Sequence, residues 1–163
     1  MQIKKVIIVL ALVALAIVPL AAKGAAAVGV ELGQPTGITF RYDMDGKWDG
    51  YATVAFRFGS KSAAIAAAIG GEYKVTDFNI DKAKFNVNVG IQSGAYIGIG
   101  DNSGHITVPV LGTGSVSYDW TWKNVGDFTA YIRLGLGIAI GLGTDGGGLG
   151  FGFAGALGLV YHL

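Results

Sequence analysis

The sequence predicts an all-β fold: a closed antiparallel up-and-down transmembrane β-barrel of eight strands, after an N-terminal signal peptide. Three observations point to it. Apolar residues recur at every second position through most of the chain. Residues 1–27 show the basic, apolar and small-residue parts of a secretory signal peptide in that order. In addition, 52% of the residues are hydrophobic and only 14% are charged, whereas an average soluble domain has about 25% charged residues. Much of the surface is therefore expected to face something other than water.

The leader begins with the basic pair Lys4 and Lys5, continues with the apolar run 6–18 and ends in small residues after Pro19. This order is typical of a signal peptide. An uncleaved membrane anchor, the alternative, would need about 20 apolar residues. We therefore expect a signal peptide at 1–27, cleaved between positions 22 and 27. The remaining residues, 28–163, form one barrel domain.

Two-residue alternation is clearest in the last segments of the chain. Phe151, Phe153 and Leu157 share one strand face, and the residues between them are Gly and Ala. Segment 128–142 places Leu and Ile opposite Thr, Tyr, Arg and Gly, and segment 85–99 places Val and Ile opposite amides and Gly. Each strand is therefore expected to have one apolar face and one face of small or polar residues.

Further strands are expected at 28–42, 48–58, 63–75 and 105–120, which makes seven segments in all. Bacterial single-chain barrels have an even number of strands. An eighth strand is therefore expected, concealed by a break near Gly33-Gln34-Pro35 or within 61–100. The connections are short, and the longest is expected at 76–84.

The small and polar face suits a narrow interior. A soluble lipocalin-like barrel also alternates, but its apolar face points inward and its outer face is rich in Lys and Glu. Buried charges persist when they are paired, so we expect an interior ion-pair network that leaves no open pore; an ion or proton path is the functional alternative. The residues of this network are expected to be Glu31, Arg41, Asp49, Arg57, Glu72, Lys74 and Arg133.

Aromatic residues lie near the ends of the predicted strands, where their rings would occupy membrane interfaces. Ordinary enrichment of aromatics in strands is the alternative explanation. The residues are Tyr42, Trp48, Phe58, Tyr118, Trp120, Trp122, Phe128 and Tyr161.

Several function classes are not expected. The chain has no Cys and a formal net charge of +1, which disfavours thiol chemistry and nucleic-acid binding. The Asp101, Ser103 and His105 side chains are better explained by turn chemistry than by a catalytic triad, and His162 is expected to bond inside the barrel. No metal-ligand spacing or dinucleotide motif appears, so no cofactor and no catalytic residue is predicted.

In its leader, hairpin spacing and last strand, the chain resembles the small bacterial outer-membrane β-barrel proteins of the OmpA/OmpX-like type. That resemblance implies an outer-membrane location, contact with outer-membrane lipids and recognition by the barrel-assembly machinery. The alternating residues Leu157, Leu159 and Tyr161 fit the assembly signal of such barrels, although the chain ends in Leu163 instead of an aromatic residue.

We therefore expect a monomeric, non-enzymatic outer-membrane barrel with a structural or envelope-interaction role. Three alternatives remain open at this point. They are a narrow passive, porin-like channel, a lipid-modifying barrel enzyme and a soluble ligand binder.

Overall fold

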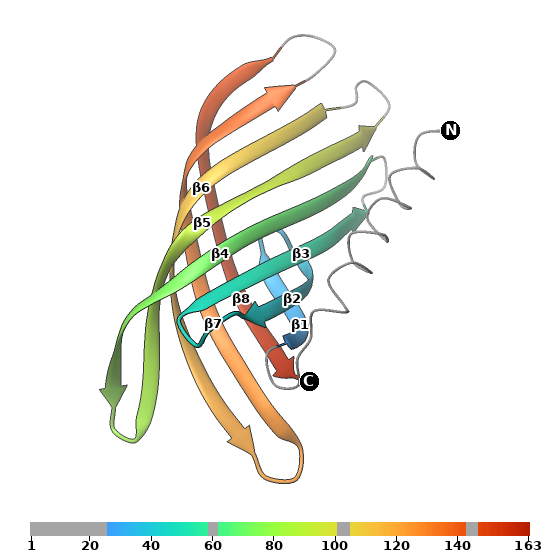
Figure 1. The fold of residues 1–163 in the computed structure, drawn as a ribbon. Coiled ribbons are helices and arrows are strands. Elements are labelled where there is room, and N and C mark those ends of the chain that lie inside the picture. The colour runs from blue at the N-terminus through green and yellow to red at the C-terminus, as the bar shows by residue number, and fades with distance from the viewer. Residues whose placement is uncertain (1–25, 59–61, 101–104, 143–146) are drawn as a thin grey trace.

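The computed structural model describes residues 26–58, 62–100, 105–142 and 147–163, which form eight antiparallel strands and no helix. Each strand pairs with its neighbours in sequence, and β1 also pairs with β8, so the sheet closes into a ring (Figure 1). Among the described residues there is no helix of the length and apolarity needed to cross a membrane. The strands are β1 (Ala26–Gly33), β2 (Gly37–Asp43), β3 (Trp48–Phe58), β4 (Ser62–Ile80), β5 (Ala83–Gly100), β6 (His105–Trp122), β7 (Gly126–Leu142) and β8 (Gly148–His162).

The eighth strand arises from the break at Gly33-Gln34-Pro35, the first of the two places expected. Gly33 has a φ of +140°, and its N–H donates to the Thr36 hydroxyl at 2.9 Å. Pro35 has no N–H to donate to a ladder. These residues end β1 and turn the chain into β2.

The prediction of a long connection at 76–84 was wrong. β4 continues to Ile80 and β5 starts at Ala83, so only Asp81 and Lys82 connect them. The register shifts between Lys74 and Thr76, which is a β-bulge. A bulge inserts one residue into the alternation, and for this reason the sequence pattern broke at Val75 although the strand continues.

The hairpins differ in length. β4 to β7 have 17–19 residues, whereas β1 has 8 and β2 has 7. The β4–β5 and β6–β7 hairpins project from one end of the molecule, beside which the C-terminus lies (Figure 1). We call this the lower end and the opposite end the upper end. The β1–β2 connection points toward the upper end, but β3 and β8 extend above it (Figure 1).

The ring is closed only in its lower part. Pairing of β1 with β8 stops at Gly33 and Ala156, and pairing of β2 with β3 stops at Gly37 and Ala55. β3 continues to Phe58, and β8 begins at Gly148. Above the β1–β2 hairpin, the ladders among the described residues pair β3 with β4 and β8 with β7, and the described part of the wall has an opening between β3 and β8.

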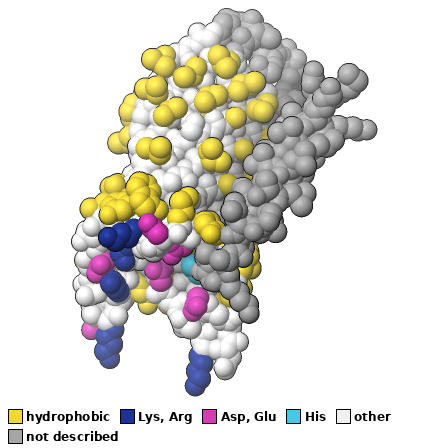
Figure 2. Space-filling view, viewed as in Figure 1, with side chains coloured by type: hydrophobic (Ala, Val, Ile, Leu, Met, Phe, Trp, Pro, Cys, Tyr) yellow, Lys and Arg dark blue, Asp and Glu magenta, His cyan; other side chains and the backbone are white. Residues whose placement is uncertain are grey.

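Side chains point as the alternation predicts. Polar residues such as Thr39, Thr53 and Asn88 are buried inside the ring. Many outward residues are large and apolar, and hydrophobic side chains are spread over the outer surface of the wall (Figure 2). The fold is thus polar at its centre and apolar outside.

Candidate functional site in the interior

Four charged residues from four different strands meet in the middle of the interior. Arg41 Nη2 lies 3.0 Å from Glu72 Oε2, and Arg133 Nη1 lies 3.8 Å from Glu72 Oε1. Arg133 Nη2 also bonds Glu31 Oε2. Glu31 and Arg133 are 102 positions apart in sequence, so only closure of the ring through β1 and β8 brings them together.

Two tyrosines and an amide complete this cluster. The Tyr131 hydroxyl donates to Glu31 Oε2 at 2.5 Å, and the Tyr51 hydroxyl donates to Gln92 Oε1 at 3.1 Å. The Arg133 guanidinium lies 3.8 Å from the centre of the Tyr51 ring, which is cation–π geometry. We call the whole cluster the ion-pair layer: Glu31, Arg41, Tyr51, Glu72, Gln92, Tyr131 and Arg133.

The ion-pair layer is shielded from solvent. Glu31, Glu72 and Arg133 are 0%, 1% and 3% exposed. Charges removed from water to this extent are tolerated only when paired and hydrogen-bonded. A planar guanidinium has five donors, and this allows Arg133 to contact both glutamates at once. The layer is therefore a buried core of paired charges.

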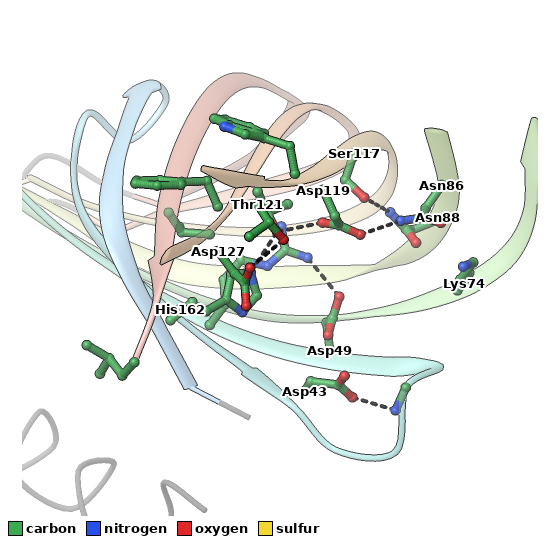
Figure 3. Close-up of a pocket in the computed structure, with 18 of the residues that line it drawn as sticks. Asp43, Asp49, Lys74, Asn86, Asn88, Ser117, Asp119, Thr121, Asp127 and His162 are labelled. Atoms are coloured by element: carbon green, nitrogen blue, oxygen red, sulfur yellow. Dashed lines mark hydrogen bonds and ion pairs between the residues drawn. The ribbon is translucent and has the colours of Figure 1, made fainter. Parts of the chain in front are cut away.

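A lower cavity of about 490 Å³ opens below the ion-pair layer. Its hydrogen bonds form a chain in which the Thr129 hydroxyl donates to Asp119 Oδ1 at 2.6 Å and lies 2.8 Å from His162 Nε2. Asn86 donates to the other oxygen of Asp119 at 2.8 Å (Figure 3). His162 thus bonds inside the ring. No cluster of three or more His, Asp or Glu suited to a metal ion occurs among the described residues.

An upper cavity of about 660 Å³ lies on the other side of the ion-pair layer. Its described lining residues are uncharged, and most are small or apolar. Leu111, which is 1% exposed, forms part of its floor and pairs in register with Gln92 of the ion-pair layer. The two cavities have no described lining residue in common, so the layer separates them.

The structure brings together Glu31, Arg41, Glu72 and Arg133 of the predicted network. Asp49 Oδ2 accepts from Arg41 Nη2 at 3.1 Å and forms the lower border of the layer. The remaining two predicted residues are not in the layer as described. Lys74 lines the lower cavity, and Arg57 pairs through its backbone with Ala64, while its side chain lies outside the described part.

Sequence reasoning missed Tyr51, Gln92 and Tyr131 as members of the layer. A signal for the tyrosines was present, since each lies two positions from a predicted interior charge and so shares its strand face. Of the excluded triad, Asp101 and Ser103 lie outside the described residues. His105 begins β6, but its side chain is also outside the described part.

Outward aromatic rings form a continuous belt across β4 to β8 near the lower end. Neighbouring ring centroids are 5.2–5.7 Å apart. On β3 and β4, Trp48 and Tyr73 form a similar pair at 5.0 Å. The residues of this aromatic belt are Phe78, Phe85, Tyr118, Trp120, Phe128 and Tyr161.

The proposed assembly signal lies on the same outer surface. Leu157, Leu159 and Tyr161 of β8 point outward and are 52%, 43% and 38% exposed. Leu163 follows β8, and its N–H donates to the Ala26 carbonyl at 2.9 Å. These residues therefore form an accessible apolar strip on the outer face of β8, beside the start of β1.

Comparison with protein-family models, with curated proteins and with solved structures gave no match. The buried ion-pair layer lies between two cavities that share no described lining residue.

Proposed function

We propose that the chain is an integral β-barrel of the bacterial outer membrane, with an obstructed interior and a structural or envelope-interaction role. The observation that carries the proposal is the inverted burial. Glu31 is 0% exposed, whereas Ile91 and Phe151 are 71% and 76% exposed. A water-soluble barrel has the opposite arrangement. Hydrocarbon is the solvent in which this arrangement is favourable.

The length of the apolar surface supports the same proposal. Outward residues are aliphatic over 132–142 of β7, and over 149–159 of β8 they are apolar or Gly. A tilted strand needs about 9–11 residues to cross the hydrocarbon core. Both spans end beside the aromatic belt, at Phe128 and Tyr161. Amphipathic rings are enriched at membrane–water interfaces.

Charged residues gather below the aromatic belt, on the projecting hairpins (Figure 2). Lys84 Nζ lies 3.3 Å from Asp77 Oδ2, and both side chains are exposed. Asp81 and Lys82 form the β4–β5 turn, and Lys123 lies in the β6–β7 turn. This distribution suits a segment in water that adjoins a segment in lipid.

The ion-pair layer favours a structural role over a passive channel. A solute moving along the axis would have to separate Arg133 from Glu31 and Glu72, which are buried charges. Breaking a buried ion pair costs about 3–5 kcal/mol. The layer also links β1, β2, β4 and β7, which stiffens the closed sheet.

The membrane proposal is tested with the mature protein, extracted in detergent and also mixed with lipid vesicles. We expect migration on a gel to change on boiling, and folded protein to float with the vesicles. Stable, folded, monomeric protein in detergent-free buffer would overturn the proposal.

The obstructed interior is tested separately, by conductance measurements in planar bilayers that contain the inserted protein. No discrete openings are expected. Regular openings would contradict the obstructed interior and would leave the membrane location intact.

A further inference from the structure

The upper cavity exists because the inner face there consists of small residues. The interior of an eight-stranded barrel is normally just filled by side chains. Here Ala55, Ala66, Ala139, Gly152 and Ala154 occupy inward positions and leave about 660 Å³. Ligand pockets have volumes of about 300–1,000 Å³. The cavity is therefore large enough for a small ligand.

The chemistry of the cavity favours an apolar ligand. Leu111 and Pro109 are buried in its wall, and most of the other lining residues are Ala, Gly, Phe or Pro. A buried water needs two to four polar partners. Among the described lining residues, side-chain polar atoms are confined to Gln34, Thr36, Tyr96 and Thr107.

Three phenylalanines connect this cavity with the outer surface. Phe56 of β3 and Phe151 and Phe153 of β8 stand on the two sides of the opening above the β1–β2 hairpin. They are 54%, 76% and 58% exposed, and each also lines the cavity. At the opening, therefore, the same apolar side chains contribute to the outer surface and to the cavity wall.

The opening also carries polar backbone groups. Strand edges without a partner present N–H and C=O groups. In the part of the chain that the structure describes, the upper parts of β3 and β8 have no ladder partner on the side of the opening. At the lower margin of the opening the Gly155 carbonyl already has a partner, since it accepts from the Gln34 N–H at 2.9 Å. An amphiphile would find an apolar cavity and a polar rim side by side.

We propose that the upper cavity binds one unbranched hydrocarbon chain of a membrane lipid, which enters sideways through the opening between β3 and β8. The narrow interior of eight strands admits a slender chain, and the phenylalanines form the entrance. Entry from the bilayer rests on the proposed membrane location, because the outer face must then lie in lipid.

The test uses single-tryptophan reporters in vesicles of phosphatidylcholine with brominated acyl chains, which quench tryptophan on contact. Trp48, Trp120 and Trp122 are first replaced by Phe. Tyr96→Trp then places the reporter in the upper cavity. Leu134→Trp on the outer face is the positive control, and Ser117→Trp in the lower cavity is the negative control. Each variant is first shown to be folded by its gel migration.

We expect the Tyr96→Trp reporter to lose about as much fluorescence as the Leu134→Trp reporter. Quenching no greater than that of the Ser117→Trp reporter would overturn the inference. If even the Leu134→Trp reporter is unaffected, the protein is not in the bilayer and the proposed function itself fails. The two failures are therefore distinguishable.

A second variant blocks the cavity. Ala154→Phe is expected to abolish quenching of the Tyr96→Trp reporter, because it fills space beside Leu111. Ala130→Phe, on the outer face of the same sheet, should leave quenching unchanged. Equal quenching in both variants would contradict a chain inside the cavity.

A free fatty acid is the other source of the same chemistry. Cis-parinaric acid, a fluorescent linear fatty acid, is added to the protein in unbrominated vesicles. Saturable binding that Ala154→Phe abolishes, in a protein whose Tyr96→Trp reporter is not quenched by brominated lipid, would overturn the bilayer source and assign the cavity to a free chain.

Discussion

The ring of Tyr131 lies directly against Gly158, its partner in the β7–β8 ladder. A Cβ atom at position 158 would be 2.1 Å from Cζ of Tyr131. Tyr51 lies in the same way on Gly70, its partner across β3 and β4, where the distance would be 2.3 Å. These two glycines let the tyrosines lie along the inner wall, from which they reach the ion-pair layer.

Gly158→Ala should therefore destabilise the fold, because the added methyl group displaces the Tyr131 ring and weakens its bond to Glu31. Overpacking of this kind costs about 1–3 kcal/mol. The measurement is the free energy of unfolding in urea, in lipid vesicles. Gly114→Ala is the matched control, since nothing lies within 4 Å of its Cβ position. Equal stability of the two variants would contradict the packing argument.

Arg133→Met should destabilise the protein strongly, because it leaves buried Glu31 without its cation. The expected cost is about 3–5 kcal/mol. Lys84→Met is the control: it breaks the exposed pair with Asp77, for which the expected cost is about 0–1 kcal/mol. Both are measured as changes in the free energy of unfolding.

The pairing is tested further by adding Glu31→Gln to Arg133→Met. The double variant should be more stable than the sum of the single effects predicts, because no buried charge is then left unpaired at that contact. Strict additivity would show that the two side chains are energetically independent.

Much of the fold was predictable because alternation is a local property. The two-residue alternation of apolar residues over 128–142 and 151–163 indicated both the strands and the direction of their side chains. Pro35 marked the break that gives the eighth strand. The β4–β5 hairpin was not predictable in the same way. The bulge at Val75 shifts the phase of the pattern, and polar residues beyond it looked like a loop.

The candidate site was predictable only as a set of inward charges. Strand parity placed Glu31 and Arg133 in the interior, but the contact between them depends on the register of β1 with β8 and of β7 with β8. The two cavities depend on closure of the ring and on the unequal lengths of its strands. Such long-range geometry is not contained in any local pattern.

Leu134→Arg tests whether the outer face lies in lipid or in water. Leu134 is 55% exposed on the outer face of β7. An arginine on the lipid face costs about 2–4 kcal/mol at the bilayer midplane and less toward the interfaces, so the variant, which lies between the two, should unfold at lower urea concentration in vesicles. Val125→Arg, in the β6–β7 turn, should change stability little. If Leu134→Arg were as stable as Val125→Arg, the face around Leu134 would lie in water.

The β2–β3 turn should respond to acid. Oδ1 of Asp45 accepts from the N–H groups of Lys47 and Trp48 at 2.9 and 2.8 Å. These bonds, with a smaller contribution from the charge of Lys47, hold the pKa of Asp45 below its ordinary value of 3.8. Because the folded pKa is the lower one, the carboxylate stabilises the turn above the ordinary value, and the effect is lost as pH falls through the folded pKa.

NMR titration of the Trp48 amide is the corresponding measurement. Its chemical shift should change with a midpoint below pH 3.8, and Asp45→Asn should remove the change because the amide side chain does not titrate. A midpoint above that value in the unsubstituted protein would contradict the hydrogen bonds to Asp45.

The proposed leader would have to be cleaved at a position that leaves β1 intact. Ala26 is the first residue of β1, and Ala27 is 3% exposed and pairs with both Arg41 and His162. Cleavage after Ala27 would remove these contacts and the carbonyl that accepts from Leu163. We therefore predict that the mature protein begins at Lys23 or Ala25, after cleavage at Ala22 or Gly24. Intact-mass measurement of protein purified from the envelope decides this, and a mature chain that begins at Val28 would show that β1 does not need its first two residues.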